Sequence, residues 1–251
     1  MHRRFVVCLV TILIVFGSFI NLVEMTEIGN SEPENIISQF GGSRGTHKRI
    51  TINNNSDFTT ITTAEGWSGN GTIGNPYIIE NLTINANDGW HGIFIGNTTV
   101  YFVIQNCTIT GATRRNHPYN TGFGISLDGV KNGRINNNQL SGNNYGINIY
   151  RSSDIVVENN NCSDNGNWTN DCGIWIYSSR YVIARNNICN NMSHGIAIIG
   201  GSFCLTIDRN TCNLNINNGI GCVRLSNSLV QIIPAIITRG GYPLHITPII
   251  M

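Results

Sequence analysis

Charged residues are scarce in this sequence. They make up 12% of its 251 residues, and the formal net charge is +1. A chain of this composition has no strong electrostatic field, which argues against a nucleic-acid partner. Hydrophobic residues reach 41%, so the chain can bury a sizeable core. Because these residues are periodic and often β-branched, the composition is not that of a disordered chain.

Paired cysteine motifs and helix-favouring stretches are absent as well. None of the eight cysteines lies in the CxxC spacing that zinc and redox sites use, which argues against a thiolate metal site. Asparagine supplies about one residue in seven and glycine 28 residues, a composition rich in turn formers. We therefore expect no substantial helix beyond the N-terminal segment.

The N-terminal segment has the features of an export signal. A basic start, Met1-His2-Arg3-Arg4, precedes the apolar run from Phe5 to Ile20. The run is long for a signal peptide and has no clean small-residue cleavage site, so an uncleaved membrane anchor is the alternative. Residues 1–25 form this segment and residues 26–48 a linker. We expect an extracellular or cell-surface protein that meets a membrane only through this segment.

A short segment, Gly-Ile-x-(Ile/Leu/Cys), recurs along the chain. Its copies begin at Gly92, Gly124, Gly146, Gly173, Gly195 and Gly219, with spacings of 32, 22, 27, 22 and 24 residues. The sequence therefore predicts an all-β fold, a right-handed parallel β-helix (solenoid) of about six coils over residues 77–231. A predicted N-terminal cap at 49–76 precedes the coils. An atypical apolar tail at 232–251 is either a further cap or a truncated end.

Alternation within the repeat assigns the two faces of each strand, because successive side chains point to opposite sides. In the Gly-Ile strand the predicted inward residues are Ile93/Ile95, Ile125/Leu127, Ile147/Ile149, Ile174/Ile176, Ile196/Ile198 and Ile220/Cys222. In the following strand they are Ile79, Ile104, Ile135, Val157, Ala184 and Ile207. Each buried isoleucine contributes about 1.5–3 kcal/mol, so we expect this stack to be the main stabilising term.

Two further columns follow the second strand. They consist of Asn138, Asn160, Asn187 and Asn210, and of Cys162, Cys189 and Cys212 two positions later. Stacked asparagines can hydrogen-bond along the stack and to turn backbone, which predicts an asparagine ladder at a sharp turn between sheets. Cysteines stacked on neighbouring strands lie about 4.8 Å apart, and we favour reduced, buried thiols over a disulfide between coils.

The segment before the coils carries a recognisable set of residues. It contains Asp57-Phe58, then Trp67-Ser68-Gly69-Asn70-Gly71-Thr72 and Asn75-Pro76-Tyr77-Ile78-Ile79-Glu80-Asn81. These residues resemble the N-terminal segment of prokaryotic, largely archaeal, surface β-helix proteins. The coils are similar to repeats shared by NosD-type periplasmic copper-accessory proteins and carbohydrate-active β-helix enzymes, over residues 51–228. The resemblance implies the fold, whereas function does not follow from fold.

The copper role of the NosD-type branch finds no ligand set in this sequence. Histidines beyond the N-terminal segment, at 47, 91, 117, 194 and 245, have no paired ligand spacing. Met192 is the lone methionine of the coils. We therefore expect no metal and no cofactor, and copper delivery is the second alternative function.

Carbohydrate-active β-helix enzymes supply the first alternative, a polysaccharide lyase or glycoside hydrolase. Such enzymes use clusters of aspartates with arginine or lysine on one outward strand face. On the matching face of this chain Asp128 stands alone and is only a weak catalytic candidate. We therefore favour a non-catalytic protein over an enzyme.

Two predicted turns are enlarged, at Thr110–Gly122 and Ser163–Cys172. They belong to coils two apart and should flank a notch, with Arg114, Arg115 and Trp168 on its rim. Nearby outward residues are Asn148, Tyr150, Trp175 and Tyr177. Aromatic rings beside amides suit the apolar faces and hydroxyl edges of sugars. The sequence therefore predicts binding of a polysaccharide or a glycosylated surface protein, and aromatics that merely cover the sheet are the alternative.

Overall fold

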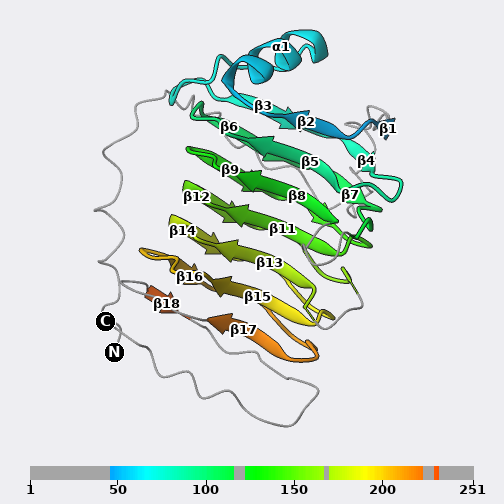
Figure 1. The fold of residues 1–251 in the computed structure, drawn as a ribbon, viewed down its shortest axis with the longest axis vertical. Coiled ribbons are helices and arrows are strands. Elements are labelled where there is room, and N and C mark those ends of the chain that lie inside the picture. Colours follow the sequence, from blue (N-terminus) through cyan, green and yellow to red (C-terminus); the bar gives the residue numbers. More distant parts are fainter. Residues whose placement is uncertain (1–45, 116–121, 167–169, 223–228, 232–251) are drawn as a thin grey trace, which may run out of the picture. The chain divides into compact units, whose positions relative to one another are not determined.

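The computed structural model describes residues 46–115, 122–166, 170–222 and 229–231. The predicted signal segment, the tail at 232–251 and most of the linker lie outside these ranges. All pairs between named strands are parallel, and the chain visits three sheets in turn, coil after coil (Figure 1). This architecture is the predicted right-handed parallel β-helix. In the described part of the chain, no helix has the length and apolar character needed to cross a membrane.

The three sheets are named here in the order in which each coil visits them. The first sheet consists of β2 (Ile50–Ile52), β5 (His91–Gly96), β8 (Phe123–Asp128), β11 (Tyr145–Tyr150), β13 (Cys172–Tyr177), β15 (His194–Ile199) and β17 (Asn218–Cys222). The second sheet consists of β3 (Tyr77–Glu80), β6 (Phe102–Gln105), β9 (Gly133–Asn136), β12 (Ser153–Glu158), β14 (Arg180–Arg185), β16 (Thr206–Asp208) and β18 (Leu229–Gln231). The third sheet consists of β1 (Thr46–His47), β4 (Thr83–Asn85), β7 (Thr108–Thr110) and β10 (Gln139–Leu140).

The predicted inward columns form the core. In the first sheet Ile125, Ile147 and Ile174 pair in register on successive strands and are fully buried. The inward column of the second sheet is likewise in register and buried from β3 to β16. Stacking of like side chains from coil to coil therefore builds one continuous apolar column. Cys222 keeps the predicted register with the buried Ile198 but is exposed, whereas Ile220 on the same strand is buried.

One helix corrects the expectation that no substantial helix follows the N-terminal segment. Helix α1 (Asn55–Glu65) begins after Asn54, whose side chain accepts a hydrogen bond from the backbone N–H of Asp57, and ends at Gly66 in the left-handed conformation. Phe58 points from the helix into the core and stacks on Tyr77, with ring centroids 4.9 Å apart. These local caps and one buried ring outweigh the weak helical signal of a Thr-rich segment.

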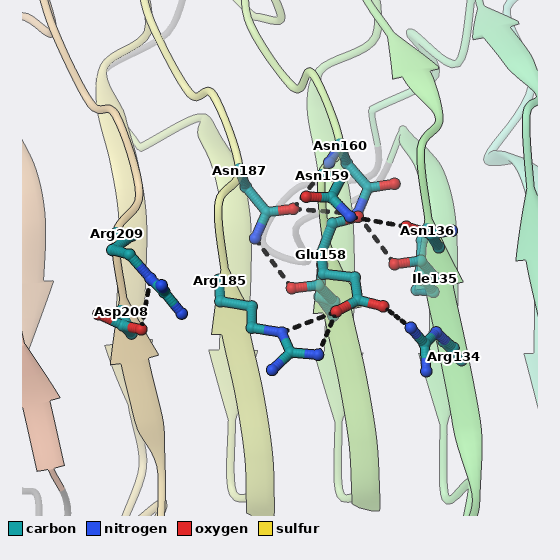
Figure 2. A network of polar contacts seen from close by, with 11 residues as sticks. Arg134, Ile135, Asn136, Glu158, Asn159, Asn160, Arg185, Asn187, Asp208 and Arg209 are labelled. Carbon is teal, nitrogen blue, oxygen red and sulfur yellow. Dashed lines mark hydrogen bonds and ion pairs between the residues drawn. The ribbon is translucent and has the colours of Figure 1, made fainter. Parts of the chain in front are cut away.

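The asparagine column lies at the turn from the second sheet to the third. Each side-chain amide donates to the Oδ1 of the next asparagine, as from Asn160 to Asn187 at 3.0 Å (Figure 2). The same Oδ1 also accepts the backbone N–H of the preceding asparagine, here that of Asn160 at 3.0 Å. Bonds of this kind run from Asn138 to Asn210. They satisfy buried turn groups that would otherwise destabilise the fold.

Two further ladders were not predicted. Five positions after each asparagine of the first ladder come Asn143, Asn165, Met192 and Asn215, which stack at the turn from the third sheet to the first. In this ladder the thioether of Met192 takes the place of an amide and accepts the backbone N–H of Asn165 at 3.0 Å. The turn from the first sheet to the second carries Ser152, Ser179 and Ser202, each hydroxyl accepting a backbone N–H from the preceding coil. All three turns are thus fixed by stacked side chains.

The cysteine column consists of free thiols in the core. Cys162, Cys189 and Cys212 are buried and form no disulfide. Hydrogen bonding with Cys162 raises the pKa of the Cys189 thiol, and burial raises it further. A neutral buried thiol packs as a small apolar side chain, so this column extends the core.

Candidate functional site

An unbroken run of aromatic rings lies on the outer side of the first sheet. It consists of Phe123, Tyr145, Tyr150, Trp175 and Tyr177, which we call the aromatic face. Trp175 stacks on Tyr145 with centroids 5.4 Å apart and meets Tyr177 edge-on at 6.4 Å. Tyr177 in turn packs against Tyr150 at 5.4 Å. The three rings predicted for this face therefore form one contacting cluster with two that were not predicted.

Tyr145 was missed because the strand alternation breaks at a glycine. Counted from the buried Ile147, a strict period of two would place Tyr145 in the core. Its ring instead packs against Phe123 and Trp175, outside the main core cluster. The intervening Gly146 lets β11 lie close to β13, since a Cβ there would lie 2.4 Å from the carbonyl oxygen of Gly173. Tyr145 is itself only 1% exposed, so it packs beneath the neighbouring rings and adds no exposed surface.

The two insertions are tied together by an ion pair. Arg115, from the first insertion, donates from Nη1 and Nη2 to the two carboxylate oxygens of Asp171 at 3.0 and 2.6 Å. The Asp171 side chain is 1% exposed and that of Arg115 33%. The pair joins residues 56 apart in sequence and bridges the predicted notch. Bidentate geometry and burial make it a rigid clamp beside the aromatic face.

The clamp lies next to the hydroxyl end of Tyr145. Tyr145 is 1% exposed, and burial raises the pKa of its phenol, with the Asp171 carboxylate raising it further. Burial likewise raises the pKa of the neighbouring Cys172 thiol to about 12. Tyr145 is therefore a neutral residue whose ring packs against Trp175, and it does not titrate near neutral pH.

One cation and one carboxylate lie beside Tyr150 of the aromatic face. The Arg151 guanidinium lies 4.6 Å from the ring centroid of Tyr150 and is exposed. Asp128 pairs in register with Tyr150 on the neighbouring strand. Burial raises the pKa of Asp128, and the positive charge of Arg151 opposes that shift. Sequence analysis missed Arg151 because it follows the repeat at a left-handed position, with a φ of 48°.

The other predicted site residues occupy varied positions. Asn148 is only 7% exposed, and its amide donates to the Ser126 hydroxyl at 3.0 Å. The Arg114 guanidinium lies 5.0 Å from the centroid of the Trp90 ring. Trp168 lies outside the described residues. Within the described ranges, no three His, Cys, Asp or Glu side chains gather as a metal-binding group.

These features define a parallel β-helix protein that carries a cluster of aromatic rings on the outer side of its first sheet. Its sequence matches the right handed beta helix region family over residues 66–231, and the chain belongs to this family. No curated protein matches the sequence significantly. The resemblance to archaeal surface proteins and to the NosD-type branch stays a prediction.

Several solved structures share part of this fold. The enzymatically active domain of a tailspike protein from bacteriophage CBA120 has a TM-score of 0.49 and 18% identity, covering 73% of this chain and 26% of that one. The full-length tailspike, from an Escherichia coli O157:H7 phage, has a TM-score of 0.43 and 18% identity, covering 62% and 24%. The A-module of a mannuronan C-5 epimerase from Azotobacter vinelandii has a TM-score of 0.30 and 16% identity, covering 65% and 54%. The chain thus spans about a quarter of each tailspike and about half of the epimerase module.

Proposed function

We propose that this chain is an exported β-helix module that binds a glycan on its aromatic face. The glycan belongs to a polysaccharide or to a glycosylated surface protein. The export signal predicted for residues 1–25 supports an extracellular or cell-surface location. The observation that carries the binding proposal is the run of five contacting rings on the outer side of the sheet, four of them partly exposed.

Physical chemistry favours a sugar chain on such a surface. Partly exposed rings of Tyr150, Trp175 and Tyr177 present flat apolar area, while the phenol hydroxyls offer hydrogen bonds at the edges. The Arg115–Asp171 clamp holds the neighbouring loops in place, so less conformational entropy is lost on binding. We include Asn148 in the proposed binding surface because it lies beside Trp175 in register. Its hydrogen bond to Ser126 holds the amide in place.

The double variant Tyr150→Ala/Trp175→Ala tests this function. Each stacking contact contributes about 0.5–1.5 kcal/mol beyond area burial, so losing two should weaken binding roughly tenfold or more. Binding is measured on a glycan array and then by calorimetry with the glycan found. Phe94→Ala is the matched control, because Phe94 lies in the same outward column on β5, away from the clamp.

Thermal stability of both variants is measured in parallel. Full retention of binding by the folded double variant would place the ligand elsewhere. If no glycan on the array binds the wild-type protein, a structural role in the cell envelope replaces the proposal.

A polysaccharide lyase or glycoside hydrolase is the second candidate, because burial raises the pKa of Asp128 at the edge of the aromatic face. A carboxyl group with a raised pKa is suited to acid catalysis. Asp171, the other carboxylate at this face, is engaged by Arg115 and is not free to act as a second acid or base. The proposal therefore expects no turnover of a polysaccharide panel. Turnover that is abolished in Asp128→Asn would instead establish the enzyme.

A further inference from the structure

A buried carboxylate lies on the outer side of the second sheet, away from the aromatic face. Glu158 ends β12 and is 2% exposed. Arg185, its register neighbour on β14, donates from Nε to Oε2 at 2.7 Å and holds Nη2 2.6 Å from the same oxygen (Figure 2). On β9, the register neighbour of Glu158 is Asn136, and Arg134 lies two positions before it. The Nη2 of Arg134 contacts the Oε1 of Glu158 (Figure 2). One carboxylate therefore orients two guanidinium groups, and we call these three residues the arginine triad.

The arginine triad carries a surplus of one positive charge. Two guanidinium groups face a single carboxylate, and neither contacts a second one among the described residues. The nearest carboxylate along the column, Asp208, is paired with its own Arg209 at 2.9 Å (Figure 2). The side chains of Arg134 and Arg185 are 49% and 40% exposed. Each guanidinium has five N–H groups, so both keep donors that Glu158 does not use.

The surroundings of the triad suit a sugar as well as an anion. Val156 and Ile183 lie in the same row as Arg134, point outward and are partly exposed. Next to Glu158, Asn159 donates from its amide to Asn136 at 3.0 Å (Figure 2). The surface thus combines an apolar strip, neutral amides and fixed cations within a few strands.

We propose that the arginine triad binds the carboxylate or sulfate group of an acidic polysaccharide. Arginine N–H groups match such oxyanions in bidentate geometry, and charge-assisted hydrogen bonds are the stronger kind. Glu158 fixes both side chains in advance, so binding costs little further side-chain entropy. This site lies on a different sheet from the aromatic face and does not depend on the function proposed for that face.

The test is calorimetric titration of the full chain with oligogalacturonate, a sulfated oligosaccharide and a neutral glucose oligomer of equal length. The two acidic probes separate the carboxylate from the sulfate. Wild-type protein should bind at least one of them, more weakly as salt rises, and should bind the neutral oligomer much less. A neutral oligomer that binds as tightly as both acidic ones would overturn the proposal.

The key variant is Arg134→Gln/Glu158→Gln/Arg185→Gln. It replaces the ion triad with neutral side chains that can still hydrogen-bond, so no unpaired charge is left buried. It loses two positive charges and one negative charge, a net change equal to that of the control Arg209→Gln on the same face. The triple variant should lose at least about tenfold in affinity for the acidic probe, and the control less than about twofold.

Three results would refute the site. The first is a triple variant that binds the acidic probe as tightly as wild type. The second is loss of acidic binding in Tyr150→Ala/Trp175→Ala, which would move the anion to the aromatic face. The third is duplex DNA that binds as tightly as the acidic oligosaccharide, because the triad would then be a general polyanion site.

Discussion

Ile147→Asp should leave the chain without a cooperative fold at 25 °C. Ile147 is fully buried between Ile125 and Ile174 of the neighbouring strands. The change removes about 1.5–3 kcal/mol of apolar burial and also places a carboxylate where no cation can reach it. The second cost is several kcal/mol, so the two together approach the about 5–15 kcal/mol that stabilises a typical domain.

Far-UV circular dichroism and a thermal melt measure this effect. Thr51→Asp is the control, because Thr51 lies on β2 of the same sheet with its side chain exposed between two buried isoleucines. The control should melt close to wild type, since a carboxylate there is solvated. A wild-type melting temperature for Ile147→Asp would disprove the assigned inward column.

Gly146→Ala should have the second largest effect, a loss of about 1–3 kcal/mol. A Cβ at Gly146 would lie 2.4 Å from the carbonyl oxygen of Gly173 and 2.9 Å from the Cβ of Cys162. The first neighbour is backbone of the adjacent strand, so relief requires β11 and β13 to move apart along their hydrogen-bonded edge. Every residue stacked on that edge would share the displacement.

Chemical denaturation of the variant gives the change in unfolding free energy. Gly74→Ala is the matched control, because nothing lies within 4 Å of its added Cβ. This control should be neutral or slightly stabilising, since alanine restricts the unfolded chain. Equal stability of the two variants would show that the repeated glycine is not required by close packing.

The repeat made most of the fold predictable because coil formation is local. Alternation within single strands assigned Ile147 and Val157 to the core, and stacking of like residues gave the register between coils. The second ladder was not predicted, although Asn165 follows Asn160 at an offset that also holds in other coils, because Met192 interrupts the asparagine pattern. Helix α1 was missed because its stability depends on Phe58 entering a core that the segment itself does not contain.

The candidate site was predictable only in part. Tyr150, Trp175 and Tyr177 follow from strand alternation, and the structure joins them in one surface. Tyr145 did not follow, because its ring packs against Trp175 of the neighbouring coil instead of following the strand alternation. Arg151 also lay outside the repeat, and its place over Tyr150 depends on a left-handed backbone conformation.

By itself, the sequence determined the β-helix, its inward columns and the side of the sheet on which aromatic residues collect. Periodicity encodes these features, because each coil repeats the same local burial pattern. Only the tertiary structure decided that Arg115 reaches Asp171 across one coil. It also decided that Glu158 forms ion pairs with both Arg134 and Arg185. Such pairings depend on side-chain reach between strands that the sequence separates by more than twenty residues. A repeat pattern specifies which residues face outward, but it does not specify which of them meet.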